Sequence, residues 1–184
     1  LIEHRNWEAA LLTDVAYKET GVRELGVGGV TWTIITHGLV AIGLGPAWTR
    51  RWREGGSVSH MGNGYRDGLA RTLAIEIPSD GLRKGFFLVV HYAPTSDKSV
   101  LIRNHHRGQI TKILEKYKGY KVLVVGGDCN AEMGPEEVAR ENGIQGPFGP
   151  RKHSKTGKEW TKWAMEQGML LTNSFFKQTQ RNTW

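Results

Sequence analysis

The sequence holds a single cysteine, Cys129, among its 184 residues. One thiol excludes an intramolecular disulfide, and such sparing use of cysteine is typical of a reducing compartment. The chain also lacks any apolar run near 20 residues, which argues against a transmembrane helix. Its first residues have neither the apolar core nor the cleavage motif of a signal peptide, and the chain does not begin with methionine. We therefore expect an intracellular protein, seen here as a fragment or a processed product.

Long runs of like charge, internal repeats and low-complexity segments are absent as well. The 25 lysine and arginine residues outnumber the 18 acids, which gives a net charge of +7. Because this excess is spread along the chain, it predicts a basic binding face on a folded domain rather than a basic tail. Such a face attracts polyanions, with nucleic acid or an anionic membrane as candidates. With 39% hydrophobic residues, the chain is long enough to bury a substantial core.

A run of four aliphatic residues at 122–125 predicts a buried strand with both faces covered. Gly126 and Gly127 follow and permit a sharp turn. If the chain stays extended past them, the side chains of Asp128 and Asn130 point to the same side. A carboxylate and an amide at the end of a buried strand suit a hard cation and either a phosphate oxygen or a nucleophilic water. The same two residues also suit a solvated Asx turn.

Residues 86–91 predict a second buried strand, which leads into Tyr-Ala-Pro-Thr at 92–95. Leu-Leu-Thr-Asn-Ser-Phe-Phe follows at 170–176, and Thr-Trp ends the chain. In this order and spacing, Tyr-Ala-Pro-Thr and the later Gly-Asp-x-Asn resemble motifs of the endonuclease/exonuclease/phosphatase superfamily. Within it, the chain is most similar to the endonuclease domains of LINE-type (non-LTR) retrotransposons and their domesticated relatives. The resemblance runs from about residue 7 to the end of the chain.

The resemblance implies one domain over residues 1–184 with a four-layer α/β sandwich, in which two packed mixed sheets are flanked by helices. It also implies cleavage of DNA phosphodiesters with Mg²⁺ or Mn²⁺, in the nucleus or in an organelle or other assembly. A phosphoinositide or sphingolipid phosphatase of the same superfamily is a weaker alternative, because the Thr-Asn-Ser-Phe-Phe segment is typical of the retroelement branch.

Site residues follow from the resemblance position by position. Asp14 becomes the metal ligand, Tyr92 a hydrogen-bond donor to phosphate, and Asp128 the residue that orients or deprotonates the nucleophile. Asn130 becomes an oxyanion-binding amide, and Asn173 an amide that shapes the site or contacts the substrate. Each also has a structural alternative: a turn or cap for the acids and amides, and a half-buried ring at a strand end for Tyr92.

The chain departs from the family pattern in three places. Asp14 stands where the family has a glutamate, and Glu19 is a second candidate for that position. An asparagine on an earlier strand and a terminal Ser-Asp-His complete the family's site, and neither occurs here. We therefore expect a weak or inactive nuclease, because catalytic groups that act as a unit fail together. The alternative is a domesticated, non-catalytic subunit whose open sheet edges are covered by other proteins.

Aromatic and cationic residues alternate at 48–53. Arg50, Arg51 and Arg53 are candidates for phosphate contacts, with Trp48 or Trp52 stacking on a base. Alternatively, this is a surface loop whose tryptophans plug the edge of the core while the arginines stay in water.

Two neighbouring histidines, His105 and His106, lie about 100° apart on a predicted helix, which disfavours a shared metal ion. The remaining pattern predicts strands at 7–14, 31–36, 39–44, 71–77, 169–173 and from 175 onward, with a hairpin that joins 31–36 to 39–44. It also predicts helices at 101–117, 135–141 and 157–168, and turn-rich segments at 15–29 and 55–68.

Overall fold

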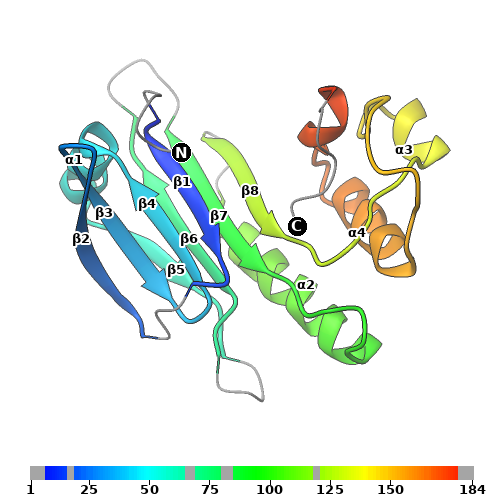
Figure 1. Ribbon diagram of the computed structural model, residues 1–184, viewed down its shortest axis with the longest axis horizontal. Helices are drawn as coiled ribbons and strands as arrows, with labels where there is room; N and C mark the ends of the chain where they lie inside the picture. Colours follow the sequence, from blue (N-terminus) through cyan, green and yellow to red (C-terminus); the bar gives the residue numbers. More distant parts are fainter. Residues whose placement is uncertain (1–6, 16–18, 65–68, 80–84, 118–120, 178–184) are drawn as a thin grey trace. The chain divides into compact units, whose positions relative to one another are not determined.

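Figure 1 shows the computed structural model, which describes residues 7–15, 19–64, 69–79, 85–117 and 121–177. The chain divides into two units. The first comprises Leu1–Ala93 and Val100–Asp128, and the second comprises Pro94–Ser99 and Cys129–Trp184. The strands named below all belong to the first unit.

The first sheet contains β1 (Ala9–Thr13), β2 (Gly21–Val27), β3 (Val30–His37) and β4 (Val40–Leu44), in the order β1-β4-β3-β2, with every pair antiparallel. The hairpin predicted between residues 31 and 44 is confirmed, and Gly38 supplies its positive φ of 60°.

Strand β2 falls in a segment that the sequence predicted to be turn-rich, so that prediction is wrong. Within the described sheet the strand lies at the edge beside β3, and five of its seven residues are exposed. Because it buries neither face, it has no need of the alternating apolar pattern that marks a strand in a sequence.

The second sheet contains β5 (Ser59–Met61), β6 (Thr72–Ile77), β7 (Phe86–Tyr92) and β8 (Val122–Asp128), in that order. Strands β7 and β8 are parallel, and α2 (Val100–Leu114) connects them. Such a crossover is what a parallel pair requires.

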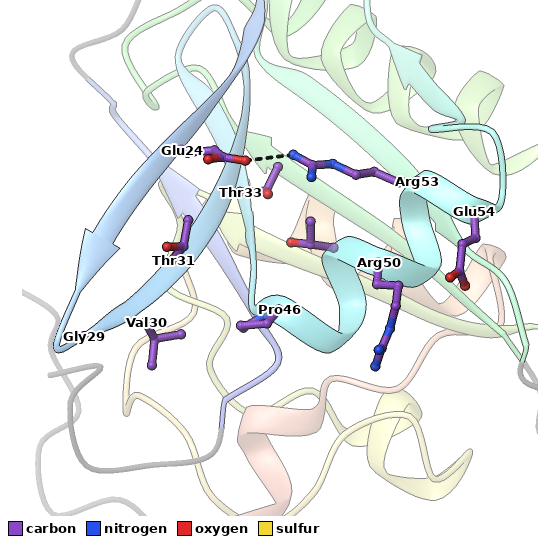
Figure 2. Close-up of a pocket in the computed structure, with 10 residues that line it drawn as sticks. Glu24, Gly29, Val30, Thr31, Thr33, Pro46, Arg50, Arg53 and Glu54 are labelled. Carbon is purple, nitrogen blue, oxygen red and sulfur yellow. Dashed lines mark hydrogen bonds and ion pairs between the residues drawn. The ribbon is translucent and has the colours of Figure 1, made fainter.

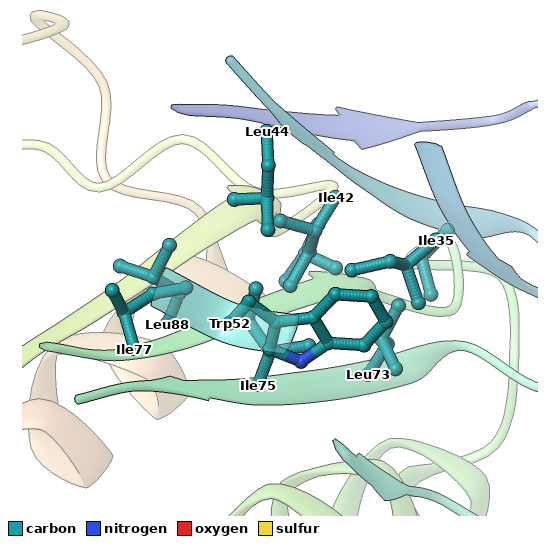
Figure 3. Close-up of a cluster of buried hydrophobic side chains, with 10 residues drawn as sticks. Ile35, Ile42, Leu44, Trp52, Leu73, Ile75, Ile77 and Leu88 are labelled. Atoms are coloured by element: carbon teal, nitrogen blue, oxygen red, sulfur yellow. The ribbon is translucent and has the colours of Figure 1, made fainter. Parts of the chain in front are cut away.

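The two sheets pack face to face, which confirms the predicted α/β sandwich. Their shared core is entirely aliphatic apart from one tryptophan, and consists of Ile35, Val40, Ile42, Leu44, Trp52, Leu73, Ile75, Ile77, Leu88 and Val90 (Figure 3).

The segment with alternating tryptophans and arginines forms a helix, α1 (Pro46–Glu54), rather than a loop. Gly45 precedes it in an extended conformation, and Pro46 occupies the first turn, where its missing N–H costs nothing. The Trp52 side chain is only 4% exposed and lies among the aliphatic side chains of both sheets. Trp48 packs on Phe86 with their ring centroids 4.6 Å apart. The prediction of a loop is therefore wrong, whereas the prediction that the tryptophans plug the core is confirmed.

The predicted cover over both faces of residues 122–125 is also wrong. Val122 and Val124 are 42% and 39% exposed. Strand β8 is an edge strand, and β1 of the opposite sheet meets it further along, at Gly126. The first half of β8 therefore keeps one apolar face open.

The second unit contains α3 (Glu137–Glu141), α4 (Lys155–Glu166) and a 3₁₀ helix, η1 (Thr172–Phe175). The Ser154 Oγ caps α4 by accepting a hydrogen bond from the Gly157 N–H at 3.0 Å. Both predicted helices are confirmed, with shifted ends. Among the residues described, no helix has the length and apolar character that crossing a membrane requires.

The strands predicted at residues 169–173 and from 175 onward are wrong. Leu171 makes one isolated bridge, to Gln145, and the 3₁₀ helix follows at once. The Ser174 hydroxyl donates to the Leu171 carbonyl and accepts from the Gly146 N–H at 2.7 Å. Such local bonds satisfy the backbone without a ladder.

Candidate active site at one end of the first unit

Three of the predicted site residues meet at one end of the first unit. Tyr92 and Asp128 are register partners on the parallel strands β7 and β8. Neighbouring strands lie about 4.8 Å apart, and register partners project to the same face of the sheet. Asp14 directly follows β1, which packs on β7 and β8 and runs in the same direction (Figure 1). The carboxyl ends of three strands thus present two carboxylates and a phenol.

Backbone hydrogen bonds connect the strand ends at this place. The Val15 N–H donates to the Leu39 carbonyl at 3.2 Å, and the Leu39 N–H donates to the Ala70 carbonyl at 2.9 Å. The first bond connects the end of β1 to the β3–β4 turn, and the second joins this turn to the start of β6. In the second sheet, the Ala93 N–H donates to the Asp128 carbonyl at 2.8 Å. The backbone that carries the candidate residues is therefore fixed on both sheets.

The two glycines before Asp128 are explained by close packing. A Cβ on Gly126 would lie 2.6 Å from Leu11 Cδ1, so the glycine lets β1 approach β8. Gly127 has a φ of 146°, and a Cβ there would overlap the His91 carbonyl oxygen. Both glycines bring strands together beneath Asp128, and a larger residue at either position would push them apart.

Arg71 also lies at this end of the first unit, although no motif in the sequence marks it. Its guanidinium carbon lies 5.4 Å from the centroid of the Tyr92 ring, which is a cation–π contact. Its carbonyl accepts a hydrogen bond from the Tyr92 N–H at 2.9 Å. The only signal in the sequence is a basic residue at the start of a predicted strand, and its partner becomes evident only from the pairing of β6 with β7.

Strand order separates the two candidates for the metal-binding acid. Asp14 lies at the end of β1, on the edge of the sheet that packs over β8. Glu19 precedes β2, at the other edge, about 14 Å away if strands are spaced about 4.8 Å apart. Glu19 is also 3.0 Å from the Arg23 guanidinium, with which it forms an exposed ion pair. The geometry favours Asp14.

The two predicted amides belong to the second unit. Strand β8 ends at Asp128, and Asn130 has a left-handed φ of 47°. The strand thus continues past both glycines to Asp128, but the chain is not extended as far as Asn130, so the condition for the two side chains to point to the same side is not met. Asparagine is one of the few residues that tolerate this conformation, because its short side chain can bond locally. Asn173 is exposed on η1.

The three arginines of α1 lie at the opposite end of the first unit from Asp128. Trp48 of α1 packs on Phe86, the first residue of β7, whereas Tyr92 is its last. Six steps of about 3.3 Å separate these ends by about 20 Å. Arg50 and Arg53 line a groove beside the β2–β3 hairpin, where Arg53 forms an ion pair with Glu24 at 2.9 Å (Figure 2). Arg51 is half-buried on the same helix. None of the three can share a phosphate with Asp128.

The carboxylates at this end suit Mg²⁺. This ion is bound by oxygen, keeps several waters, and needs only one or two carboxylates when a phosphate supplies further ligands. Asp14 and Asp128 are the acids that follow or end the strands here. Among the described parts of the chain, no group of three or more histidine, cysteine, aspartate or glutamate side chains is arranged as a closed metal site.

The two neighbouring histidines of α2 face different surroundings. His105 is exposed, whereas His106 is buried, with its Nε2 3.4 Å from Nδ1 of His91 on β7. Burial lowers the pKa of His91 to about 4. Burial, followed by the charges of His91, Arg71 and Arg107, lowers the pKa of His106 to about 2. Both rings are therefore neutral at pH 7 and act as packing groups.

Comparisons of the chain with protein families and with curated proteins find no match.

Proposed function

We propose that this protein is a Mg²⁺-dependent phosphodiesterase that cuts DNA, an endonuclease of the retroelement type. The observation that supports this most directly is the side-by-side placement of Tyr92 and Asp128, with Asp14 at the end of the strand that packs over them. A net charge of +7 agrees with a polyanionic substrate.

Each residue has a role that follows from its chemistry. Asp14 would hold Mg²⁺, which when bound neutralises phosphate charge and lowers the pKa of water. The Asp128 carboxylate orients the attacking water and accepts its proton. The Tyr92 hydroxyl donates a hydrogen bond to a non-bridging phosphate oxygen, and the Arg71 guanidinium beside it stabilises the added negative charge.

The described residues at this end include no evident donor of a proton to the leaving group. His37 lies near this end, but its ring nitrogens are each 2.8 Å from an oxygen, of Gly62 and of Thr20. His91 is buried on the other face of β7. Because no described imidazole at this end is available as an acid, we expect slow turnover.

Nicking of supercoiled plasmid tests the proposal. The wild-type chain should convert plasmid to the open-circular form with Mg²⁺ and not with EDTA. Asp128→Asn should abolish this, and Tyr92→Phe should reduce it by about tenfold or more, since removal of a hydrogen bond to developing charge costs that much. Glu115→Gln, an exposed acid beyond the end of α2, is the matched control and should nick like the wild type. Nicking that needs no metal, or that survives Asp128→Asn, would contradict the proposal.

The open half of β8 favours a second candidate function, that of a non-catalytic subunit in a larger protein assembly. Val122 and Val124 are exposed on one face of the strand that forms the edge of the second sheet as described, and an edge strand with an open apolar face is a site for association with another chain. Sedimentation at high concentration tests this: Val124→Lys should weaken association, and Val138→Lys, at an exposed valine of α3, should not. A protein that stays monomeric and nicks DNA would rule the second function out.

A further inference from the structure

The second unit contains a small cavity that the candidate site above does not use. Its volume is about 220 Å³. Phe148, Leu171 and Phe176 form apolar walls, and Asn173 and Lys177 contribute an amide and an ammonium group. The lining therefore combines aromatic rings with amides, a hydroxyl and a cation. It differs from an ordinary packing defect, which is lined by apolar groups alone.

Hydrogen bonds hold the walls of this cavity in place. The Phe148 N–H donates to the Ser174 carbonyl at 2.9 Å, and the Gly146 N–H donates to the Ser174 hydroxyl at 2.7 Å. Behind them, the Gln145 side-chain amide donates to the Gly134 carbonyl at 2.8 Å. A Cβ on Gly146 would overlap the Ser174 carbonyl oxygen, so the loop lies directly against η1. The cavity is therefore preformed, and a ligand that enters it orders little new structure.

The exposed groups at the cavity match the parts of a nucleotide. Phe176 is 68% exposed, an unusual state for a phenyl ring, and can stack on a flat aromatic partner. The Asn173 amide carries both a donor and an acceptor, as the hydrogen-bonding edge of a base does. The Lys177 ammonium suits the neighbouring phosphate.

The volume of the cavity limits the size of the ligand that it can hold. Pockets for whole drug-sized molecules begin at about 300 Å³, so this cavity takes a single ring system. An apolar side chain of a protein partner would also fit, but the net charge of +7 favours a polyanion. We infer that this cavity binds one unstacked nucleobase of a single-stranded or locally opened nucleic acid. The inference rests on the proposed function for the kind of partner.

Binding of a short single-stranded DNA that contains 2-aminopurine, measured by fluorescence in EDTA, tests the inference without cleavage. Phe176→Ala should weaken binding by about tenfold or more, as loss of base stacking does elsewhere. Asn173→Ala should weaken it by a smaller factor. Phe175→Ala is the matched control, because this neighbouring ring is 40% exposed and does not line the cavity. Each variant should keep the wild-type melting temperature. An abasic oligonucleotide of the same length should bind the wild type and Phe176→Ala equally weakly.

Equal binding of the base-containing strand by wild type and Phe176→Ala would overturn the inference even if plasmid nicking succeeds. Displacement of the strand by a phenylalanine-containing peptide, and not by free nucleoside, would assign the cavity to a protein side chain and would also overturn it. Failure of nicking together with tight, Phe176-dependent binding would instead contradict the proposed catalysis and leave the base site standing.

Discussion

At Gly127, a backbone φ of 146° and the adjacent His91 carbonyl leave no room for a side chain. We predict that Gly127→Ala lowers the free energy of unfolding by about 2–3 kcal/mol, because strain and a backbone clash arise together. Gly126→Ala should cost less, about 1 kcal/mol, since its Cβ meets only the flexible end of Leu11. Urea denaturation measures both. Equal losses would show that the two glycines are not distinguished by backbone contact.

The pair of buried histidines predicts a dependence of stability on pH. Burial depresses the pKa values of His91 and His106 from 6.5 to about 4 and about 2. Below about pH 6.5 the unfolded chain binds protons that the folded chain does not, so stability is full above this pH and falls as the pH drops toward 4. The slope should reach about 1 kcal/mol per pH unit for each histidine.

Chemical denaturation at several pH values measures this slope. His106→Gln should flatten it between pH 6.5 and pH 4, at some cost in stability at pH 7. His105→Gln, at the exposed neighbour, should leave the slope unchanged. A slope that His106→Gln does not alter would assign the acid sensitivity to other groups.

At the scale of elements, α1 closes the end of the core that lies away from Asp128. Trp52 is 4% exposed, and its Nε1 donates to the Val58 carbonyl at 3.2 Å. We predict that Trp52→Ala destabilises the fold by about 3–5 kcal/mol, through removal of the ring and the cavity left behind. Trp52→Phe should lose less, because most of the volume stays. Thermal or urea unfolding measures the stability of both variants. Equal losses of stability would mean that the hydrogen bond of Trp52 contributes more than the packing of its ring.

The strands that were predicted correctly from the sequence are those in which burial requires a pattern of apolar residues. Strands β3, β4, β6 and β7 carry the shared core, and each is rich in aliphatic residues. Strand β2 is exposed on both faces, and its sequence has no such pattern. The cover over β8 could not be predicted, because it depends on how far the opposite strand reaches. The alternation of tryptophan and arginine in α1 fits a loop as well as a helix with one buried face.

Prediction of the site was limited in a similar way. The strand-end motifs identified Tyr92 and Asp128, and the structure pairs these two residues on parallel neighbouring strands. Arg71 was missed, because its position depends on the register between β6 and β7. The choice between Asp14 and Glu19 required the order of strands in the first sheet. Local motifs thus identify strand ends, and tertiary pairing decides which other groups join them.

At the scale of the whole chain, the segments that connect the two units begin directly after the candidate residues. The chain leaves the first unit after Ala93, next to Tyr92, and again after Asp128. The second unit is therefore covalently joined to the strand ends that carry the proposed catalytic groups.

The distribution of charge predicts how salt affects DNA binding. Removing one cationic side chain that binds a phosphate should reduce the slope of log K against log salt by about 1. Arg71→Ala should do so, because this guanidinium lies beside Tyr92 at the proposed site. Arg50→Ala should leave the slope unchanged, since α1 lies about 20 Å away at the other end of the first unit. Binding of a short duplex, measured by fluorescence anisotropy in EDTA at several salt concentrations, compares the two. A slope that falls for Arg50→Ala and not for Arg71→Ala would place the DNA along the groove of α1 and away from Asp128.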